Sequence, residues 1–401
     1  MTIDQQIQSL QRRTDRIVPE AHLRQKLERS TKTGKPLRIK LGMDPTAPDV
    51  TLGHCVPLKV VRQFQEWGHK AVLIIGDYTA RVGDPSGRNT TRPVLSGEEI
   101  DANAKTYVTQ VGKILLTGAE HLEVRFNGEW FKSMDLLDIL KLTAQKTVAQ
   151  MLAREDFNNR YKEGVDIRLH EFLYPLMQGH DSVRVDADVE MGGSDQLFNN
   201  LVGRDLMEQA GKEGQCVIVT PLLVGTDGVN KMSKSKKNYI AVTDAPSGQE
   251  GMFGKIMSLP DALMESYYTL LTDIPEAEFK AMIVTSPRDA KITLAKHVIA
   301  WLHTPAEAEG AAEEFMRVFS RKEVPDDMPE VKIDGPGPHK LAPLIVKAGL
   351  ASSNGEAIRK IKENAVSLDG VKVSPGDFNK EQVFTGPVVL KLGRKFARLV
   401  V

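Results

Sequence analysis

The sequence has very little cysteine, no net charge and no long apolar run, and each shortage excludes a class of protein. Its 401 residues contain two cysteines, Cys55 and Cys216, too few for a disulfide scaffold and too far apart for a Cys-x-x-Cys metal or redox pair. No apolar run approaches the roughly 18 residues of a membrane-spanning helix, and residues 1–13 lack the apolar core of a secretory signal. We therefore expect a cytoplasmic protein with no zinc site and no membrane partner.

The zero net charge conceals an uneven distribution. Lys plus Arg and Asp plus Glu each number 53, so no global cationic field attracts a nucleic acid. In residues 339–401, however, eleven basic residues face five acidic ones, which gives this tail a charge of +6 and the remainder −6. A predicted helix at 355–364 gathers Arg359, Lys360 and Lys362. We interpret this helix as an RNA-binding face, the alternative being a solvated cationic helix on an ordinary small domain.

The first half of the chain has the pattern of a parallel sheet wrapped by helices. Length predicts two to four domains, and 41% hydrophobic residues suffice for a buried core. Apolar and polar residues alternate over 37–43, which predicts a strand, and apolar residues recur at helical spacing over 53–67, which predicts a crossover helix. Residues 71–75 form a short apolar run typical of a buried strand in a parallel sheet. This βαβ unit predicts an α/β fold. Further strands are expected at 122–126, 183–189 and 217–224.

Other segments predict an insertion, a helical region and a small terminal unit. Residues 133–161 read as all-helical, and after about residue 240 the strand signal fades into amphipathic helices. Proline and glycine then concentrate before residue 338, as in an extended linker. The predicted boundaries are 1–240 for the α/β domain, 241–325 for the helical domain, 326–338 for the linker and 339–401 for a small α+β domain.

The most specific motif is Lys231-Met232-Ser233-Lys234-Ser235. Two lysines three residues apart in a serine-containing loop can close on a triphosphate and supply positive charge and hydroxyl donors. A chance match to this string in a chain of this length has odds of about one in ten thousand. The alternative, a flexible basic surface loop, explains the neighbouring lysines but not the string.

A second motif, Thr51-Leu52-Gly53-His54, lies between the first predicted strand and its crossover helix. Ligands bind at this end of parallel sheets, where a helix N-terminus offers free N–H groups to phosphate and a glycine permits close approach. Alone it is weak evidence, because a glycine and a histidine at a helix start are more often a helix cap and a surface imidazole. Together with the lysine loop, it forms a pair of motifs that both suit a phosphate-containing ligand.

These motifs resemble those of the class I aminoacyl-tRNA synthetases, and three more resemble the bacterial tyrosyl-tRNA synthetases. The additional motifs are Gly42-Met43-Asp44-Pro45-Thr46-Ala47, Gly83-Asp84-Pro85-Ser86-Gly87 and Gly192-Gly193-Ser194-Asp195-Gln196. The resemblance spans almost the whole chain. It implies a Rossmann-like catalytic domain, a helical anticodon-recognition domain, and a tail of the ribosomal small-subunit protein four type. Thr51 departs from the family, which has the first signature histidine there.

The resemblance implies roles at the ATP site. Lys231 and Lys234 would stabilise the transition state, while Thr46, Thr51 and His54 would meet the phosphates and ribose side of ATP. The catalytic set would then be Lys231, Lys234, Thr51 and His54. The ATP-binding set would be Thr46, Gly53, His54, Asp195, Met232, Ser233 and Lys234, with Asp195 on the ribose.

The resemblance also implies a tyrosine site. Asp84, Tyr174 and Gln178 would take the amino group, Gln196 the carboxylate and Asp181 the phenolic hydroxyl. Tyr174, Gln178 and Asp181 share one face if 168–181 is helical, although a solvated helix face has the same spacing. The remaining members would be Gly42 and Lys40.

Lys40 stands where many family members carry a tyrosine that binds the substrate hydroxyl. On the strand face of Gly42, its ammonium would either donate to the phenolic oxygen while pairing with Asp181 or extend into solvent.

The resemblance implies ATP-dependent attachment of L-tyrosine to tRNA(Tyr) through tyrosyl-adenylate, with Mg²⁺ on the pyrophosphate side and no tightly bound cofactor. The tail face of Arg359, Lys360 and Lys362 would then bind tRNA. Two alternatives remain: a tryptophanyl-tRNA synthetase and a catalytically inactive RNA-binding homologue. We also expect a homodimer through 133–161, because this insertion holds more apolar residues than an isolated excursion can bury, namely Leu136, Leu137, Leu140, Leu142, Val148 and Met151.

Overall fold

Six strands pair into one sheet in the computed structural model, which describes residues 1–85, 96–248, 250–320, 328–393 and 395–401. The strand order is β1-β6-β5-β2-β3-β4. β2 to β6 run parallel, and β1 pairs antiparallel with β6. The predicted α/β parallel sheet is therefore confirmed. The strands are β1 (Arg16–Val18), β2 (Arg38–Met43), β3 (Lys70–Ile75), β4 (Leu122–Phe126), β5 (Val189–Gly193) and β6 (Cys216–Thr220).

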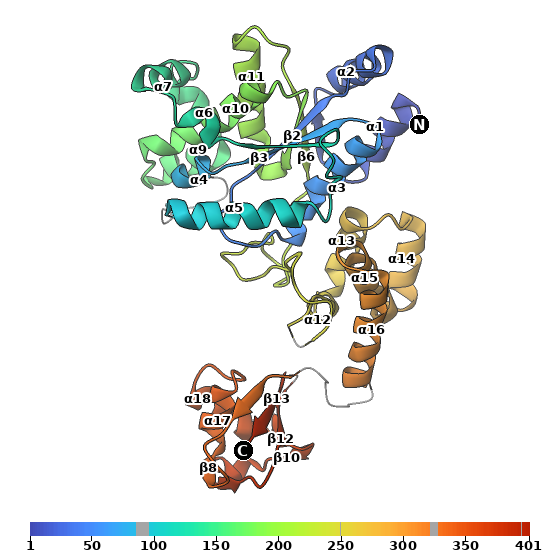
Figure 1. Cartoon of the computed structure of the whole chain (residues 1–401), viewed down its shortest axis with the longest axis vertical. Coiled ribbons are helices and arrows are strands. Elements are labelled where there is room, and N and C mark those ends of the chain that lie inside the picture. The colour runs from blue at the N-terminus through green and yellow to red at the C-terminus, as the bar shows by residue number, and fades with distance from the viewer. Residues whose placement is uncertain (86–95, 249, 321–327, 394) are drawn as a thin grey trace. The chain divides into compact units, whose positions relative to one another are not determined.

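Helices cover both faces of this sheet (Figure 1). α3 (Leu52–Glu66) packs on the sheet through apolar residues at helical spacing, and Val56, Val60 and Phe64 are fully buried. α10 (Leu173–Val185) and α11 (Leu197–Gln209) pack against each other on the opposite side. Because both faces are covered, β3 and β6 are almost continuously apolar, whereas β2 and β5 each carry a buried charged residue, Lys40 and Glu190. The predicted strand, crossover helix and strand are confirmed as β2, α3 and β3.

The strand order creates one position where a ligand can enter. From β2 the chain proceeds outward through β3 to β4, then returns to place β5 on the other side of β2 and β6 beyond it. Connections therefore leave the adjacent carboxyl ends of β2 and β5 in opposite directions, which opens a crevice between them.

The predicted strand at 183–189 is wrong. α10 continues to Val185, Asp186 ends it in the left-handed conformation with φ 49°, and the strand begins only at Val189. Val185 is buried on the helix, and the alternation of apolar and charged residues at 183–189, which is typical of a strand, here spans the end of a helix and the turn after it.

The predicted insertion is helical. It contains α7 (Leu136–Thr143), α8 (Val148–Met151) and α9 (Glu155–Glu163). Leu142 and Met151 are buried within the chain, whereas four other apolar side chains lie open. The exposed fractions are 74% for Leu136, 58% for Leu137, 55% for Leu140 and 63% for Val148.

The described chain divides into two compact units. The first comprises 1–243 with 259–287, and the second comprises 244–258 with 288–401. The region 241–325, predicted as one helical domain, is thus shared between them. α13 (Met264–Leu271) packs on α3 in the first unit. The buried guanidinium of Arg13 donates there to the carbonyl oxygens of Leu270 and Thr272 at 3.2 and 2.5 Å.

The other helices have the following bounds. In the first unit they are α1 (Ile3–Gln11), α2 (Glu20–Thr33), α4 (Thr79–Val82), α5 (Gly97–Val111), α6 (Gly128–Phe131) and α14 (Glu276–Thr285). The second unit holds α12 (Met252–Met257), α15 (Pro287–Leu302), α16 (Pro305–Ser320), α17 (Leu341–Lys347) and α18 (Asn354–Lys362). Short 3₁₀ helices lie at Leu169–Phe172, Ser194–Gln196, Asp261–Leu263 and Pro375–Asp377.

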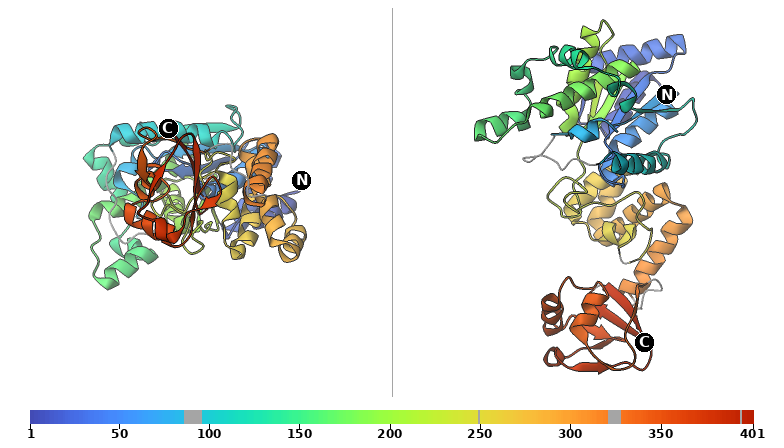
Figure 2. Two further views of the ribbon diagram at one scale, coloured as in Figure 1. Left: turned by 90° about the horizontal axis from the view of Figure 1, so that it is seen from below. Right: turned by 60° about the vertical axis from the view of Figure 1, so that its left-hand side comes forward.

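The C-terminal residues form a sheet of order β10-β9-β12-β13-β7 with a second, two-stranded sheet (Figure 2). β7 pairs parallel with β13, so residues predicted as linker belong to this sheet, and 326–327 lie outside the described residues. Ile333 joins the same apolar core as Leu341 and Leu399. The strands are β7 (Glu330–Lys332), β8 (Pro338–Lys340), β9 (Val366–Leu368), β10 (Val371–Lys372), β11 (Glu381–Val383), β12 (Val388–Leu392) and β13 (Lys395–Val400).

Candidate active site

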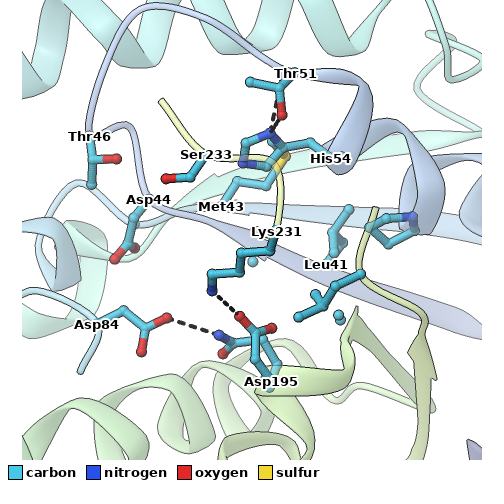
Figure 3. A pocket seen from close by; sticks show the side chains of 18 of the residues that line it. Leu41, Met43, Asp44, Thr46, Thr51, His54, Asp84, Asp195, Lys231 and Ser233 are labelled. Carbon is cyan, nitrogen blue, oxygen red and sulfur yellow. Dashed lines mark hydrogen bonds and ion pairs between the residues drawn. The ribbon is translucent and has the colours of Figure 1, made fainter. Parts of the chain in front are cut away.

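A cavity of about 530 Å³ opens at the carboxyl ends of β2 and β5, where the strand order predicts a ligand (Figure 3). All the predicted catalytic, ATP and tyrosine residues line it except Lys40. They are Gly42, Thr46, Thr51, Gly53, His54, Asp84, Tyr174, Gln178, Asp181, Asp195, Gln196, Lys231, Met232, Ser233 and Lys234. Ser86 and Gly87 of the Asp84 motif lie outside the described residues.

The lysine motif is held in an ordered loop by one buried side chain. The amide of Asn238 accepts from the N–H of Ser233 at 2.8 Å and donates to the carbonyl of Lys231 at 3.1 Å. It also donates to Asp227 at 3.0 Å. Hydrogen bonds to Asn230 and Val229 lower the pKa of Asp227 to about 2, so this carboxylate stays ionised and keeps the loop's turn closed.

The two motif lysines line the cavity and bind different partners. The ammonium of Lys231 pairs with Asp195 at 2.7 Å (Figure 3). That of Lys234 donates to the main-chain oxygen of Asp49 at 3.0 Å and to the Tyr107 hydroxyl. Two cations thus face one cavity from a single loop, an arrangement suited to an anionic ligand with several charges.

His54 lies in the first turn of α3 and is oriented by Thr51. Its Nδ1 accepts the Thr51 N–H at 3.1 Å and lies 2.8 Å from the Thr51 hydroxyl. Burial, followed by the charges of Lys234 and Lys231, lowers the pKa of His54 to about 3. The ring is therefore neutral at pH 7 and carries its proton on Nε2, which remains a donor. The Thr51 hydroxyl, expected at the phosphates, lines the cavity and contacts this ring.

Asp181 is a buried carboxyl group in the wall of the cavity. Its carboxylate accepts from Trp130 Nε1 at 2.9 Å and from Asn127 Nδ2 at 3.2 Å. Burial raises the pKa of Asp181 to about 7, while the charge of Lys40 and the hydrogen bonds from Asn127 and Trp130 act in the opposite direction. Each oxygen still has a lone pair for a further donor.

The residues predicted to bind the amino group of tyrosine also line the cavity. The Tyr174 hydroxyl donates to Asp44 at 3.0 Å, and burial together with the negative charge of Asp44 keeps the pKa of Tyr174 well above its ordinary value. Asp84 accepts from the Gln196 amide at 2.9 Å. Both Asp44 and Asp84 thus present carboxylate charge to the cavity, where a cation can be bound.

The expected placement of Lys40 is wrong in both of its alternatives. The side chain is fully buried, its ammonium pairs with Glu190 at 2.8 Å, and it neither pairs with Asp181 nor reaches solvent. Glu190 faces Lys40 on the neighbouring strand. A buried ammonium requires a nearby carboxylate, and Glu190 was not considered because strand pairing across 150 residues is invisible in the pattern.

Sequence reasoning also missed the residues that support the site. Asn127 and Trp130 follow β4 at the same sheet edge as the other ligand-facing loops, a position that could have identified them. Thr79 donates to Asp44 at 2.7 Å. Gly76 is obligatory beside it, because a Cβ there would collide with the carboxylate of Asp44.

The predicted tail face lies on α18. Ala357 and Ile361 are buried, while Arg359 and Lys362 are exposed on the other side of the helix. Glu363 pairs with Lys360 at 2.8 Å and Arg359 at 3.8 Å, and the ammonium of Lys362 lies 4.4 Å from the centre of the Phe378 ring. The helix thus presents three cations, two of them beside one carboxylate.

The described ranges contain neither a membrane-spanning helix nor a cluster of metal-binding side chains. No helix in them is both long and apolar enough to cross a membrane. Within the same ranges, no group of three His, Cys, Asp or Glu side chains is arranged to hold a metal ion.

The sequence matches two family models that together cover most of the chain. Residues 31–320 match the family described as tRNA synthetases class I (W and Y), and residues 321–399 match the tyrosine–tRNA ligase SYY-like C-terminal domain.

Individual proteins are similar over nearly their full length. The tyrosine–tRNA ligase of Ralstonia nicotianae is 48% identical over 97% of this chain and 98% of its own. That of Moorella thermoacetica is 47% identical over 99% and 96%. Among solved structures, tyrosyl-tRNA synthetase from Archaeoglobus fulgidus, complexed with L-tyrosine, has a TM-score of 0.61 at 25% identity and covers 78% of this chain and 100% of that one.

Proposed function

This chain belongs to the tyrosine–tRNA ligase family of class I tRNA synthetases, and from that premise we propose how its cavity attaches L-tyrosine to tRNA(Tyr) at the expense of ATP. The observation that carries the proposal is a single cavity with Lys231 and Lys234 on one loop and the buried carboxylate of Asp181 at another wall. The lysines suit a triphosphate, and the carboxylate suits a hydroxyl donor.

In the first step an oxygen of the tyrosine carboxylate bonds to the α-phosphorus of ATP while the bond to the bridging oxygen breaks and pyrophosphate leaves. Positioning and charge stabilisation suffice for such chemistry, and no protein nucleophile is required. Lys231 and Lys234 would neutralise the charge that builds on the departing pyrophosphate. His54, neutral and protonated on Nε2, would donate to a phosphate oxygen alongside the N–H of Gly53.

ATP binding requires a rearrangement of the ion pair between Lys231 and Asp195. Asp195 would take the ribose hydroxyls, so Lys231 has to leave it for the phosphates. Mg²⁺ would enter with ATP on the phosphate oxygens, because it prefers oxygen ligands and retains part of its water shell. Thr46, Met232 and Ser233 would complete the ATP contacts from the cavity wall.

The tyrosine would lie between the carboxylates. Asp181 would accept the phenolic O–H, while Asp84, Tyr174 and Gln178 would hold the ammonium group and Gln196 the carboxylate. Gly42 leaves open space at the end of β2, since a Cβ there would meet no atom within 4 Å. In the second step the terminal ribose hydroxyl of tRNA attacks the carbonyl carbon of the adenylate, and AMP leaves.

Two further assignments belong to the proposal. Arg359, Lys360 and Lys362 would contact tRNA phosphates, and the exposed Leu136, Leu137, Leu140 and Val148 would be covered by a second copy in a homodimer. The tRNA contact is supported by the gathering of three cations on one helix, and the homodimer by the exposure of four large apolar side chains, which is unusual on a solvated surface.

Amino-acid-dependent exchange of labelled pyrophosphate into ATP tests the function directly. Tyrosine should support exchange, whereas tryptophan and phenylalanine should not. Exchange with tryptophan would identify the tryptophanyl alternative, and no exchange with any of the three would identify an inactive homologue. Transfer to tRNA(Tyr) is then measured with the same preparation, so that loss of either step is seen separately.

A further inference from the structure

Lys40 and Glu190 form a buried ion pair directly behind the cavity. They are opposite each other on the adjacent strands β2 and β5. The exposed fraction of their side chains is 0% and 1%, and Nζ of Lys40 lies 2.8 Å from Oε1 of Glu190. Neither side chain lines the cavity, so neither can contact a substrate.

The hydrogen bonds of this pair are saturated. The ammonium has three N–H donors, and they meet Glu190 at 2.8 Å, the hydroxyl of Ser182 at 2.7 Å and the main-chain oxygen of Gln178 at 2.8 Å. The Glu190 carboxylate accepts from Gln178 Nε2 at 3.2 Å, from Ser182 at 3.1 Å and from Gln215. Lys40 has therefore no donor to spare for the tyrosine hydroxyl.

Four of these bonds end on one turn of α10. The pair holds the main chain of Gln178, the side-chain amide of Gln178 and the hydroxyl of Ser182. Gln178 and Asp181, which lie on this turn, both face the cavity. The ion pair thus ties two strands of the sheet to the helical turn that carries two substrate-facing side chains.

Stability alone does not account for such a pair. Two charges removed from water lose hydration that their mutual attraction only partly returns, and apolar residues of similar volume often serve folding as well. The pair supplies directional hydrogen bonds, which apolar residues cannot form. Those that end on Gln178 and Ser182 fix the positions of individual atoms of α10. Lys40 also lowers the pKa of Asp181 against the effect of burial, which favours the ionised acceptor.

We propose that Lys40 and Glu190 are positioning residues for tyrosine, which act by fixing the turn of α10 that presents Gln178 and Asp181. The proposal rests on the assignment of Gln178 and Asp181 to the substrate's ammonium group and hydroxyl. It predicts that the pair affects tyrosine binding and recognition, and leaves ATP binding unchanged.

The test is a double variant, Lys40→Met with Glu190→Gln, which removes both charges at nearly constant volume and leaves no unpaired ion. In pyrophosphate exchange we expect KM for tyrosine to rise at least about tenfold, KM for ATP to stay within about twofold, and the preference for tyrosine over phenylalanine to fall. The matched control is Lys26→Met. It also removes a buried lysine, paired with Asp188 at 3.4 Å outside the cavity, and should leave both KM values within about twofold.

A milder variant guards against a failure to fold. Ser182→Ala removes one oxygen that contacts both Lys40 and Glu190, and it should raise KM for tyrosine about threefold while it lowers the melting temperature only modestly. An unchanged KM for tyrosine in the folded double variant, or in Ser182→Ala if the double variant does not fold, overturns the proposal. An equal rise in both KM values also overturns it, because the pair would then be a general structural support.

Gln178→Ala and Asp181→Ala separate this proposal from the one on which it rests. If these two variants raise KM for tyrosine and the double variant does not, only the positioning role is lost. If neither variant changes KM for tyrosine, the assignment of the substrate site is wrong and the positioning role is lost with it.

Discussion

The Nδ1 atom of His54 lies 2.8 Å from the hydroxyl of Thr51, the residue that stands where the family has its first signature histidine. Thr51→Val keeps the branched shape and deletes this hydroxyl, so one of the two contacts that orient the ring is lost. We expect adenylate formation to slow by about three- to tenfold, in keeping with the ~1 kcal/mol of one hydrogen bond. Thr51→Ser keeps the hydroxyl and should retain most of the rate. Pyrophosphate exchange measures both variants, and equal rates for the two would show that the hydroxyl does not contribute.

Lys231→Ala and Lys234→Ala should reduce the rate of adenylate formation far more than tyrosine affinity. A loop that closes on pyrophosphate contributes in the transition state, so kcat should fall at least about a hundredfold while KM for tyrosine stays within about threefold. Lys237→Asn is the matched control. It removes a lysine of the same loop whose φ of 53° asparagine tolerates, and it should be nearly neutral. Losses confined to KM for ATP would mean that the lysines only hold substrate.

Asp181→Ala should weaken the discrimination between tyrosine and phenylalanine. A buried carboxylate that already accepts from Trp130 and Asn127 has room for the substrate hydroxyl, and phenylalanine leaves that acceptor unsatisfied. We expect the preference to fall at least tenfold, about 1.4 kcal/mol. Lys40 cannot compensate, since its donors are already used. Exchange assays with each amino acid measure the ratio, and an unchanged ratio would place the phenol elsewhere.

Replacement of Arg359, Lys360 and Lys362 by alanine should weaken aminoacylation and leave pyrophosphate exchange intact. If each cation neutralises one phosphate, the slope of log K against log salt should decrease by about 2. The substitution is preferable to deletion of residues 339–401, because β7 begins earlier and would lose its partner β13. Lys32→Ala with Lys35→Ala, two exposed lysines of the other unit, is the control. A fall in exchange equal to that in aminoacylation would contradict a role in tRNA binding.

Leu137→Asp combined with Leu140→Asp should produce monomers. These side chains are 58% and 55% exposed in the single chain, and a charge on each would be buried without a partner if a second copy covered them. Sedimentation at micromolar concentration should give twice the 44.4 kDa of one chain for the unaltered protein and one such mass for the variant. An unaltered protein that sediments as a monomer would exclude the proposed dimer.

The sequence was most informative where chemistry is local. The lysine loop, the turn before α3 and the stripe on α10 are each encoded within fifteen residues, and the structure brings all three to one cavity. The parallel sheet was also predictable from the sequence, because short apolar runs that alternate with helical patterns are compatible with few other folds.

The features that were not predicted depend on contacts between residues that are distant in the chain. Lys40 was placed by its strand face alone, but its partner was decided by the register of β2 with β5. Asn127 and Trp130 were overlooked because nothing near them in sequence marks the approach of Asp181. The return of residues 259–287 to the first unit was not foreseen for a similar reason, since the contact of α13 with α3 joins segments that are distant in the chain.

The hydrogen bonds of the buried guanidinium of Arg13 can form only late in the synthesis of this protein. Its carbonyl partner on Leu270 is 257 residues further along the chain, and at roughly 5–20 residues per second a ribosome needs about 13–50 s to reach it. During that interval Arg13 cannot form its hydrogen bonds to the carbonyl oxygens of Leu270 and Thr272. These bonds therefore cannot hold α1 in its final position. A nascent chain that stops at residue 240, although it already contains every strand of the sheet and the whole lysine loop, should remain open at its N-terminus and present that end to chaperones and proteases.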